Sequence, residues 1–230
     1  MADVIALERP VYGIGEAADL LGLRSNRVKA WLDGTTRKGV WYEPVIRPEH
    51  TGSDIVTWGE FVELGYLREY RRANVPLQRL RPVIDFLRKR YGTLYPLAHA
   101  RLYVEDRDLV LAAQEESDLP ASIAIVVRTG QTVMLTEPAE RFFRKVEFTS
   151  ADGGESVAAR LRPAGPTSPV VIDPRFSFGR PTVQGVATER LWELHDAGEE
   201  PDDIALAYDL ALEDVRAAVA YEDQQRSTAA

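Results

Sequence analysis

The feature of this sequence that most constrains its fold is a pair of short helical patterns between Tyr12 and Gly34. In the first pattern, apolar residues recur at the spacing of one helix face, at Ile14, Ala17, Ala18 and Leu21. Gly22 follows them, as glycine commonly follows the end of a helix. Ser25 suits the N-cap of a second helix that Gly34 ends. The inner face of this helix would carry Val28, Trp31 and Leu32. Two short helices joined by a tight turn predict a helix-turn-helix.

The next segment, residues 40–58, reads VWYEPVIRPEHTGSDIVTW. Two runs of β-branched and aromatic residues flank the turn-like HTGSD, so the pattern predicts a hairpin in the position of a wing. A longer helix is predicted at about Trp58–Arg72. Another is predicted at about Pro76–Tyr91, because Pro76 suits the start of a helix.

The character of the chain changes at residues 96–162, where short strand-like runs alternate with turn signals. The predicted strands are Arg101–Val104, Leu109–Ala112, Ile123–Val127, Val133–Thr136, Val146–Thr149 and Val157–Leu161. Turns are predicted at residues 105–108, 129–130 and 150–156, and a short helix at Pro138–Lys145. The stretch RPAGPTSP at 162–169 is rich in proline and is the best linker in the chain.

The last segment combines a short strand at Val170–Ile172 with three predicted helices. The helices are Thr188–Ala197, Pro201–Tyr208 and Leu212–Gln225. We therefore predict an α+β chain with three domains. Residues 1–95 would form a winged helix-turn-helix, 96–162 a small, mostly β module, and 170–230 a helical domain that resembles a helix-turn-helix.

Charge separates the two ends of the chain. The net charge is −8, yet residues 1–100 hold 15 Lys and Arg against 12 Asp and Glu, whereas residues 101–230 hold 13 against 24. The basic residues of the first part gather at 24–38 and 68–90. This asymmetry suggests nucleic acid as the partner of the N-terminal part and protein as the partner of the C-terminal part. Solvated helix faces are the alternative interpretation.

Two groups of residues are candidates for contact with DNA. A recognition helix presents polar and basic side chains near its N-terminus, where arginine can bind guanine, asparagine can bind adenine, and lysine can neutralise phosphate. The candidates are Arg24, Ser25, Asn26, Arg27 and Lys29 on the second helix, and Arg37 and Lys38 at the start of the wing. A helix-turn-helix used only for protein contact is the alternative.

The N-terminal part resembles the winged helix-turn-helix of the MerR group over about residues 12–91. That group shows an aromatic residue, a helix with a central alanine, a Gly-hydrophobic turn and a recognition helix that ends in an aromatic residue. Here these places are filled by Tyr12, Ala18, Gly22-Leu23 and Trp31. The long coiled coil of typical members is absent, and the lack of cysteine removes thiol-based metal sensing.

The C-terminal part, about residues 170–222, is similar to a family of unknown function often encoded beside PIN-like toxins. The residues that carry the resemblance are Asp173, Pro174, Gly179, Pro181, Gly185, Ala197-Gly198, Asp202-Asp203 and Leu212-Glu213-Asp214-Val215. The glycines and prolines of this motif are expected to set backbone geometry rather than chemistry. Residues 180–226 hold 4 basic and 12 acidic side chains, so this part would repel phosphate and suits a protein-binding or dimerising role.

The combination of these two ends resembles the larger VapB-type antitoxins. The resemblance implies a PIN-like ribonuclease toxin as partner and repression of the shared operon. A palindromic operator would require a homodimer. A MerR-like regulator without a toxin, responding to a small molecule through residues 96–162, is the alternative. An adaptor that binds only proteins is a third interpretation.

The sequence offers no pattern for catalysis, for a cofactor or for a metal site. His50, His99 and His195 lie in three different segments without ligand spacing. The carboxylate clusters at 105–108 and 199–203 fall at predicted turns or helix starts, where acidic residues are common. The start of the chain has no long apolar core, and no stretch approaches the roughly 18 apolar residues of a membrane span, so we expect a cytoplasmic protein.

Overall fold

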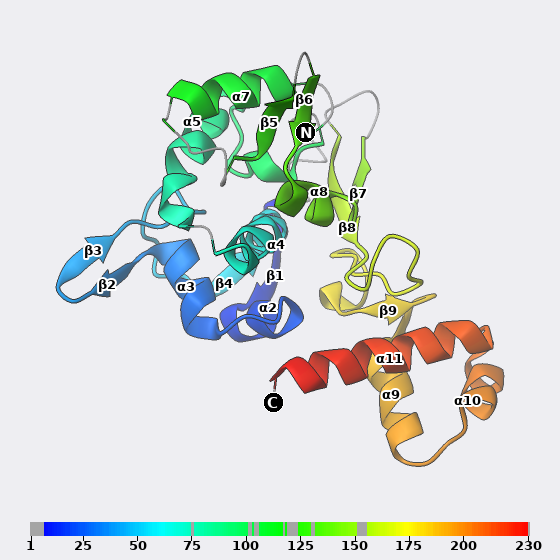
Figure 1. Cartoon of the computed structure of the whole chain (residues 1–230). Coiled ribbons are helices and arrows are strands. Elements are labelled where there is room, and N and C mark those ends of the chain that lie inside the picture. The colour runs from blue at the N-terminus through cyan, green and yellow to red at the C-terminus, as the bar shows by residue number, and fades with distance from the viewer. Residues whose placement is uncertain are drawn as a thin grey trace. The chain divides into compact units, whose positions relative to one another are not determined.

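The computed structural model describes residues 7–74, 76–100, 103, 106–116, 118, 124–129, 132–150 and 156–229. The chain forms helices and short antiparallel two-stranded sheets (Figure 1). It divides into two compact units. The first comprises Met1–Phe143 and Phe148–Ala158, and the second comprises Arg144–Glu147 and Ala159–Ala230. Within the described ranges, no helix is both long and apolar enough to cross a membrane.

The first unit begins with the predicted helix-turn-helix, formed by α2 (Ile14–Leu20) and α3 (Ser25–Asp33). Gly22 has a φ of 58° and ends α2 in a Schellman arrangement, in which the Leu23 amide donates to the Ala18 carbonyl over 2.8 Å. The inner face of α3 carries Val28, Trp31 and Leu32, all buried as predicted. The capping prediction for Ser25 is wrong, because the N-cap is Arg24 and it makes no side-chain capping bond.

The predicted hairpin around residues 50–54 is wrong. The hairpin that follows α3 is formed by β2 (Thr35–Arg37) and β3 (Val40–Tyr42), and we call it the wing hairpin. Lys38 and Gly39 form its two-residue turn with φ of 50° and 76°, the left-handed values that suit the twist of a tight hairpin. β4 (Ile55–Thr57) pairs instead with β1 (Pro10–Gly13).

Helix α4 (Trp58–Arg72) lies where it was predicted and is buried along most of its length. Its start is fixed by a capping box, in which the Thr57 side chain accepts from the Glu60 amide and the Glu60 side chain accepts from the Thr57 amide. The helix predicted at 76–91 is divided into a 3-10 turn, η1 (Leu77–Arg79), and helix α5 (Arg81–Tyr91). A second 3-10 turn, η2 (Pro96–Ala98), follows.

The strand predicted at 109–112 is wrong, because it lies within α7 (Arg107–Glu116); α7 also includes the last two residues of the turn predicted at 105–108, and residue 105 is outside the described residues. The buried residues of α7 follow a helical spacing and are Val110, Leu111, Ala113 and Gln114. Gln114 binds the next strand: its Nε2 donates to the Val126 carbonyl over 2.8 Å, and its Oε1 accepts from the Ile125 amide over 2.6 Å. The predicted strand at 101–104 and the predicted turn at 150–156 fall mainly outside the described residues.

The other predicted elements of this region are present with small shifts of their ends. The strands are β5 (Val126–Thr129), β6 (Thr132–Leu135), β7 (Val146–Thr149) and β8 (Val157–Leu161), and the helix is α8 (Glu137–Phe143). β5 pairs with β6, and β7 pairs with β8. The boundary between the two units falls within β7 and within β8, so each of these strands contributes residues to both units. The division of the chain into domains at 95 and 162 stays a prediction.

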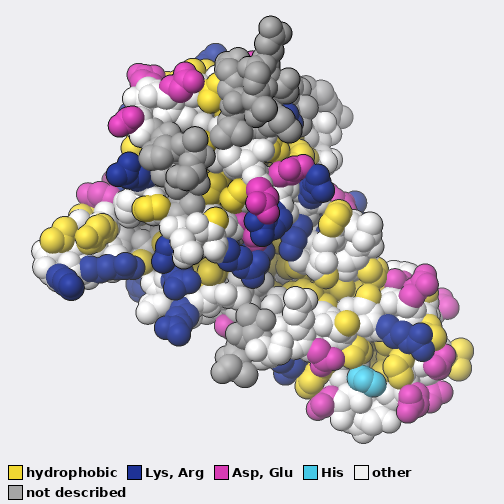
Figure 2. Space-filling view, in the orientation of Figure 1, with side chains coloured by type: hydrophobic (Ala, Val, Ile, Leu, Met, Phe, Trp, Pro, Cys, Tyr) yellow, Lys and Arg dark blue, Asp and Glu magenta, His cyan; other side chains and the backbone are white. Residues whose placement is uncertain are grey.

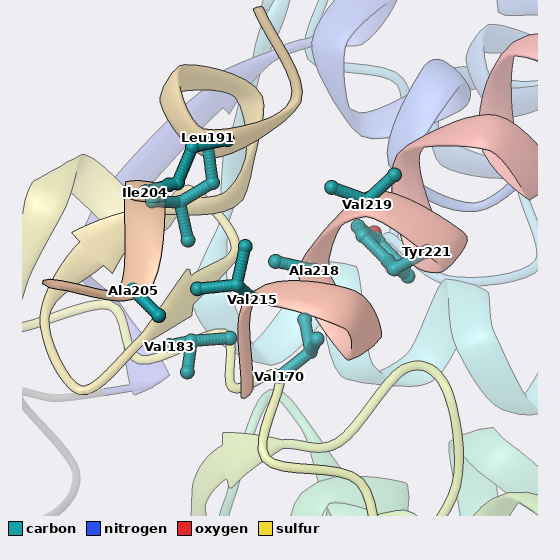
Figure 3. Packing of buried hydrophobic residues seen from close by; sticks show 9 residues of the cluster. All are labelled: Val170, Val183, Leu191, Ile204, Ala205, Val215, Ala218, Val219 and Tyr221. Carbon is teal, nitrogen blue, oxygen red and sulfur yellow. The ribbon is translucent and has the colours of Figure 1, made fainter. Parts of the chain in front are cut away.

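The second unit ends in three helices that match their predicted places: α9 (Thr188–Asp196), α10 (Pro201–Tyr208) and α11 (Leu212–Ala229). The predicted strand 170–172 is reduced to two isolated bridges, and a small hairpin joins β9 (Thr182–Val183) to β10 (Val186–Ala187). The core of this unit brings one fully buried side chain from each helix together, Leu191, Ile204 and Val215 (Figure 3).

Candidate nucleic-acid interface

Helix α3 presents a polar and basic face to solvent while its opposite face is buried. The exposed side chains are those of Arg24, Ser25, Asn26, Arg27 and Lys29, which are the residues predicted from the sequence. Because Val28 and Leu32 are fully buried on the other side, the orientation of this face is fixed by the core of the unit. Lys29 also forms an exposed ion pair with Asp54, with 2.9 Å between Nζ and Oδ1. Such a surface pair contributes little and leaves Lys29 able to change partner.

The wing hairpin places two further cationic residues at its tip. Arg37 ends β2 and Lys38 begins the turn, and both are exposed. The sequence placed them at the start of a later hairpin, whereas the structure places them at the far end of the hairpin that follows α3. Figure 2 shows Lys and Arg side chains gathered over the wing hairpin and the helix-turn-helix.

The base of the wing hairpin is held by one buried cation, Arg47, whose side chain is 5% exposed. Its guanidinium pairs with Asp33 at the end of α3 over 3.0 Å and with Glu60 at the start of α4 over 2.7 Å. It also donates to the carbonyls of Ser53 and Ile55, over 2.9 Å and 2.7 Å. We call Arg47, Asp33 and Glu60 the Arg47 cluster. The cluster joins α3, the chain after the hairpin and α4 through a single side chain.

The electrostatics of the Arg47 cluster favour its charged form. Burial alone would raise the pKa of Asp33, but hydrogen bonds from the Thr51 backbone and from the Arg47 side chain outweigh it and hold the pKa below its ordinary value. Burial lowers the pKa of Arg47, and its bonds to Glu60 and Asp33 reverse this and raise it. Sequence reasoning missed this cluster. The only available signal was an arginine between an apolar residue and a proline, Ile46 and Pro48, and its partners are distant in sequence.

Helix α5 supports the same loop from another direction. Arg81 donates to the carbonyls of Pro44 and Pro48 over 2.6 Å and 3.1 Å, and Arg88 donates to the carbonyl of Ile46. The basic stretch 68–90, which the sequence suggested would both position the wing and touch phosphate, therefore divides into inward and exposed members. Arg81 and Arg88 are directed into the protein, and the exposed members are Arg71, Arg72, Arg79, Lys89 and Arg90.

The wing hairpin also exposes an apolar strip that the sequence analysis did not single out. Val40, Trp41 and Tyr42 of β3 are 55%, 46% and 42% exposed. The ring of Trp41 lies edge-on to the His50 ring, with 6.0 Å between centroids. Gly34 allows this packing, because a Cβ at that position would lie 2.6 Å from the Tyr42 carbonyl oxygen and 2.7 Å from the Trp41 ring.

In the second unit, the contacts of Asp173 and the φ values of Gly179 and Gly185 concern the path of the backbone. Asp173 is 5% exposed and accepts from the Arg175 amide over 2.9 Å and from its guanidinium over 2.7 Å. Burial raises the pKa of Asp173, and these bonds to Arg175 overcome it and lower the pKa. Gly179 and Gly185 have φ of 75° and 88°, which glycine adopts without strain. Pro174 and Pro181 are buried.

Two family descriptions match this chain. Residues 10–84 match the "Putative DNA-binding HTH domain" and residues 170–221 match the "Protein of unknown function (DUF433)". A crystal structure, that of Rv2018 from Mycobacterium tuberculosis, superposes with a TM-score of 0.72 at 25% identity and covers 93% of this chain and 99% of that chain. The fold and these matches identify a helix-turn-helix protein that also carries a DUF433 segment. Of these two family descriptions, the first names a role, DNA binding, and the second names none.

Two curated proteins of Mycobacterium tuberculosis strain H37Rv are related to it over most of their length. "Uncharacterized protein Rv2308" is 35% identical over 226 residues, which cover 96% of this chain and 93% of that protein. "Putative antitoxin VapB45" is 32% identical over 190 residues, which cover 76% of this chain and 77% of that protein. The chain belongs to the family that contains Rv2308 and VapB45.

Proposed function

We propose that this protein is a DNA-binding antitoxin of a type II toxin-antitoxin system. In this proposal it binds the operator of its own operon as a homodimer, represses transcription, and neutralises a PIN-like ribonuclease toxin. The observation that carries the DNA-binding part is the exposed polar and basic face of α3, opposite the buried Val28 and Leu32. The winged, MerR-like character of the domain is part of the same proposal.

The geometry of the first unit suits a contact along one DNA groove. The N-terminal half of α3 would enter the major groove, where Arg27 could bind a guanine and Asn26 an adenine. Arg37 and Lys38 at the tip of the wing hairpin would contact phosphate beside the groove. The Arg47 cluster supports this arrangement, because it joins the end of α3 to the chain that follows the hairpin.

The toxin part of the proposal is supported by the name of the relative VapB45 and by the charge of the second unit. Residues 180–226 carry 12 acidic and 4 basic side chains. A ribonuclease needs a basic surface to hold RNA, and an acidic partner would be attracted to such a surface and steered toward it.

Binding to DNA is tested by gel shift with the DNA upstream of the chain's own gene, over a series of salt concentrations. We expect binding that weakens as salt rises, because phosphate contacts release counterions. Arg27→Ala should weaken operator binding by about 1–3 kcal/mol if Arg27 contacts a base. Arg216→Ala removes another exposed arginine, from α11, and is the matched control. Operator affinity equal in both variants would remove Arg27 from the interface.

Neutralisation is tested by expressing the chain together with a PIN-like ribonuclease encoded beside it. We expect the two proteins to purify as a complex and the ribonuclease activity to fall when the chain is added. Arg27→Ala should leave this inhibition unchanged, because α3 belongs to the DNA contact. Full ribonuclease activity in the presence of excess chain would refute the antitoxin part and leave the DNA-binding part standing.

A further inference from the structure

The second unit exposes three large hydrophobic side chains among its described residues. Phe176 and Phe178 are 61% and 87% exposed, and Leu206 on α10 is 85% exposed. The two phenylalanines lie in residues 175–180, Arg-Phe-Ser-Phe-Gly-Arg, which we call the Phe loop. The two exposed phenylalanines lie two residues apart in one loop, and clustered exposed apolar side chains, unlike single ones, mark surfaces that another molecule covers.

The backbone of the Phe loop is strained in a way that holds Phe178 in water. Ser177 and Phe178 have consecutive positive φ values of 48° and 55°, and such conformations are rare for residues other than glycine. The loop is fixed at its base, where Arg175 binds the buried Asp173 and the Gly179 amide donates to the Phe176 carbonyl over 2.9 Å. In the isolated unit this conformation leaves Phe178 exposed and so buries no apolar surface. A second molecule that covered Phe178 would bury that surface on binding.

A surface of complementary character lies on the same unit. Leu206 has Asp202 and Asp203 one helical turn before it and Asp209 one turn after it, and these carboxylates are exposed. We call these four residues the α10 face. The Phe loop has the opposite charge, since Arg175 and Arg180 flank its two phenylalanines. Their side chains are 54% and 60% exposed, while Arg175 also pairs with Asp173 and Arg180 approaches Glu189 at 3.9 Å.

We propose that the Phe loop of one copy of this chain docks on the α10 face of a second copy. Phe178 covers Leu206, and the guanidiniums that flank the loop approach the aspartates around Leu206. A two-fold axis lets both loops bind at once, because each copy supplies a loop and receives one. This inference rests on the homodimer in the proposed function and identifies its surface. Nucleic acid is a poorer occupant of the loop, because the acidic side chains of the surrounding unit repel phosphate.

The absence of cysteine from the chain permits a direct test by cross-linking. The full-length variants Phe178→Cys and Leu206→Cys, one carrying an affinity tag, are mixed and oxidised with glutathione disulfide. We expect a cross-linked heterodimer on a non-reducing gel, with the two introduced cysteines joined in its peptides, because a disulfide requires the two Cα atoms within about 7 Å. The control pairs Phe178→Cys with Glu193→Cys, an exposed position on α9. A heterodimer yield no higher than this control would overturn the proposal.

Sedimentation equilibrium gives an independent readout. Phe178→Ser should raise the dimer dissociation constant at least about tenfold, as expected when a central aromatic anchor is removed. Val40→Ser, which removes an exposed apolar side chain from the wing hairpin, should leave the constant unchanged. Arg180→Glu should weaken the dimer, and mixing it with Asp203→Arg should restore association.

The outcomes separate this proposal from the function on which it rests. A wild-type chain that stays monomeric at high concentration overturns the docking, while gel shift and toxin inhibition test the antitoxin separately. A Phe178→Ser variant that dimerises normally but loses its toxin assigns the loop to the toxin contact and also overturns the docking. A Phe178→Ser variant that loses RNA or DNA binding but dimerises normally assigns the loop to nucleic acid and likewise overturns the docking.

Discussion

Replacing Arg47 by methionine should unfold the first unit at much lower denaturant concentration, while leaving the second unit intact. Arg47→Met keeps an unbranched apolar stem in the same space and removes only the guanidinium. Asp33 and Glu60 would then be buried without a counter-charge, with side chains that are 2% and 8% exposed. The carbonyls of Ser53 and Ile55 would also lose their donor.

The magnitude follows from the cost of leaving a buried charge unpaired. Removing one partner of a buried ion pair lowers the free energy of unfolding by about 3–5 kcal/mol. The two orphaned carbonyls belong to Ser53 and Ile55, which are exposed residues that water can reach, so they add at most about 1 kcal/mol. A loss of about 4 kcal/mol is a large share of the roughly 5–15 kcal/mol that stabilises a domain.

The assay is urea unfolding followed by the fluorescence of Trp31 and Trp58, which are buried in the first unit. A Trp192→Phe background removes the tryptophan of the second unit. The triple change Asp33→Asn, Arg47→Met and Glu60→Gln removes all three charges, and it should recover more than half of the lost stability. A loss below about 1 kcal/mol in Arg47→Met alone would refute the reasoning that this cluster holds the unit together.

The pH dependence of the same variant gives a second check. The pKa of Asp33 is lowered in the folded protein, so its contribution is present above its ordinary pKa and is lost as pH falls through the folded value. Arg47→Met lacks this contribution at every pH. The stability difference between the wild type and Arg47→Met should therefore narrow below about pH 4, and a difference that stayed constant would argue against the ion pair.

Three other changes test separate parts of the first unit. Gly65→Ala should destabilise it by about 1–3 kcal/mol, since the new Cβ would lie 2.0 Å from the Phe142 ring; combining it with Phe142→Leu should restore part of the thermal stability. Burial raises the pKa of Glu63 to about 8, so the stability that depends on its neutral form is lost as pH rises through 8. Glu63→Gln cannot ionise, and it should therefore flatten the dependence of the unfolding free energy on pH between pH 5 and pH 9. Gly34→Ala should displace the wing hairpin, because its Cβ would lie 2.6 Å from the Tyr42 carbonyl oxygen at a φ of 78°; we expect a lower melting temperature together with weaker operator binding in a gel shift.

Local signals in the sequence predicted the helices well, because their ends are fixed by neighbouring residues. Thr57 and Glu60 form a capping box at the start of α4, and Pro201 occupies the first turn of α10, so both helices begin where they were expected. The polar face of α3 was also predictable, since Val28 and the residues one turn later define the buried side.

The errors arise where distant residues decide the structure. The run 109–112 is apolar enough for a strand, but it lies in α7, whose Gln114 binds the backbone at Ile125 and Val126, some twelve residues later in the chain. The wing was assigned to the turn-like residues 50–54, whereas β4 is paired with β1, more than forty residues earlier in the chain. No local pattern distinguishes these partners, because the choice depends on which pairing buries the most apolar surface.

Counting charges identified the basic end of the chain but overestimated the charge available to DNA. Arg47, Arg81 and Arg88 belong to the positive excess of residues 1–100, and each is directed to carboxylates or carbonyls inside the first unit. These side chains nevertheless serve the same surface. A flexible hairpin would lose conformational entropy when its tip bound phosphate, and a loop fixed by several buried hydrogen bonds has already lost it on folding. In the proposed interface, the inward arginines therefore set where Arg37 lies relative to α3, so that the affinity of the exposed charges for phosphate would depend on the buried ones.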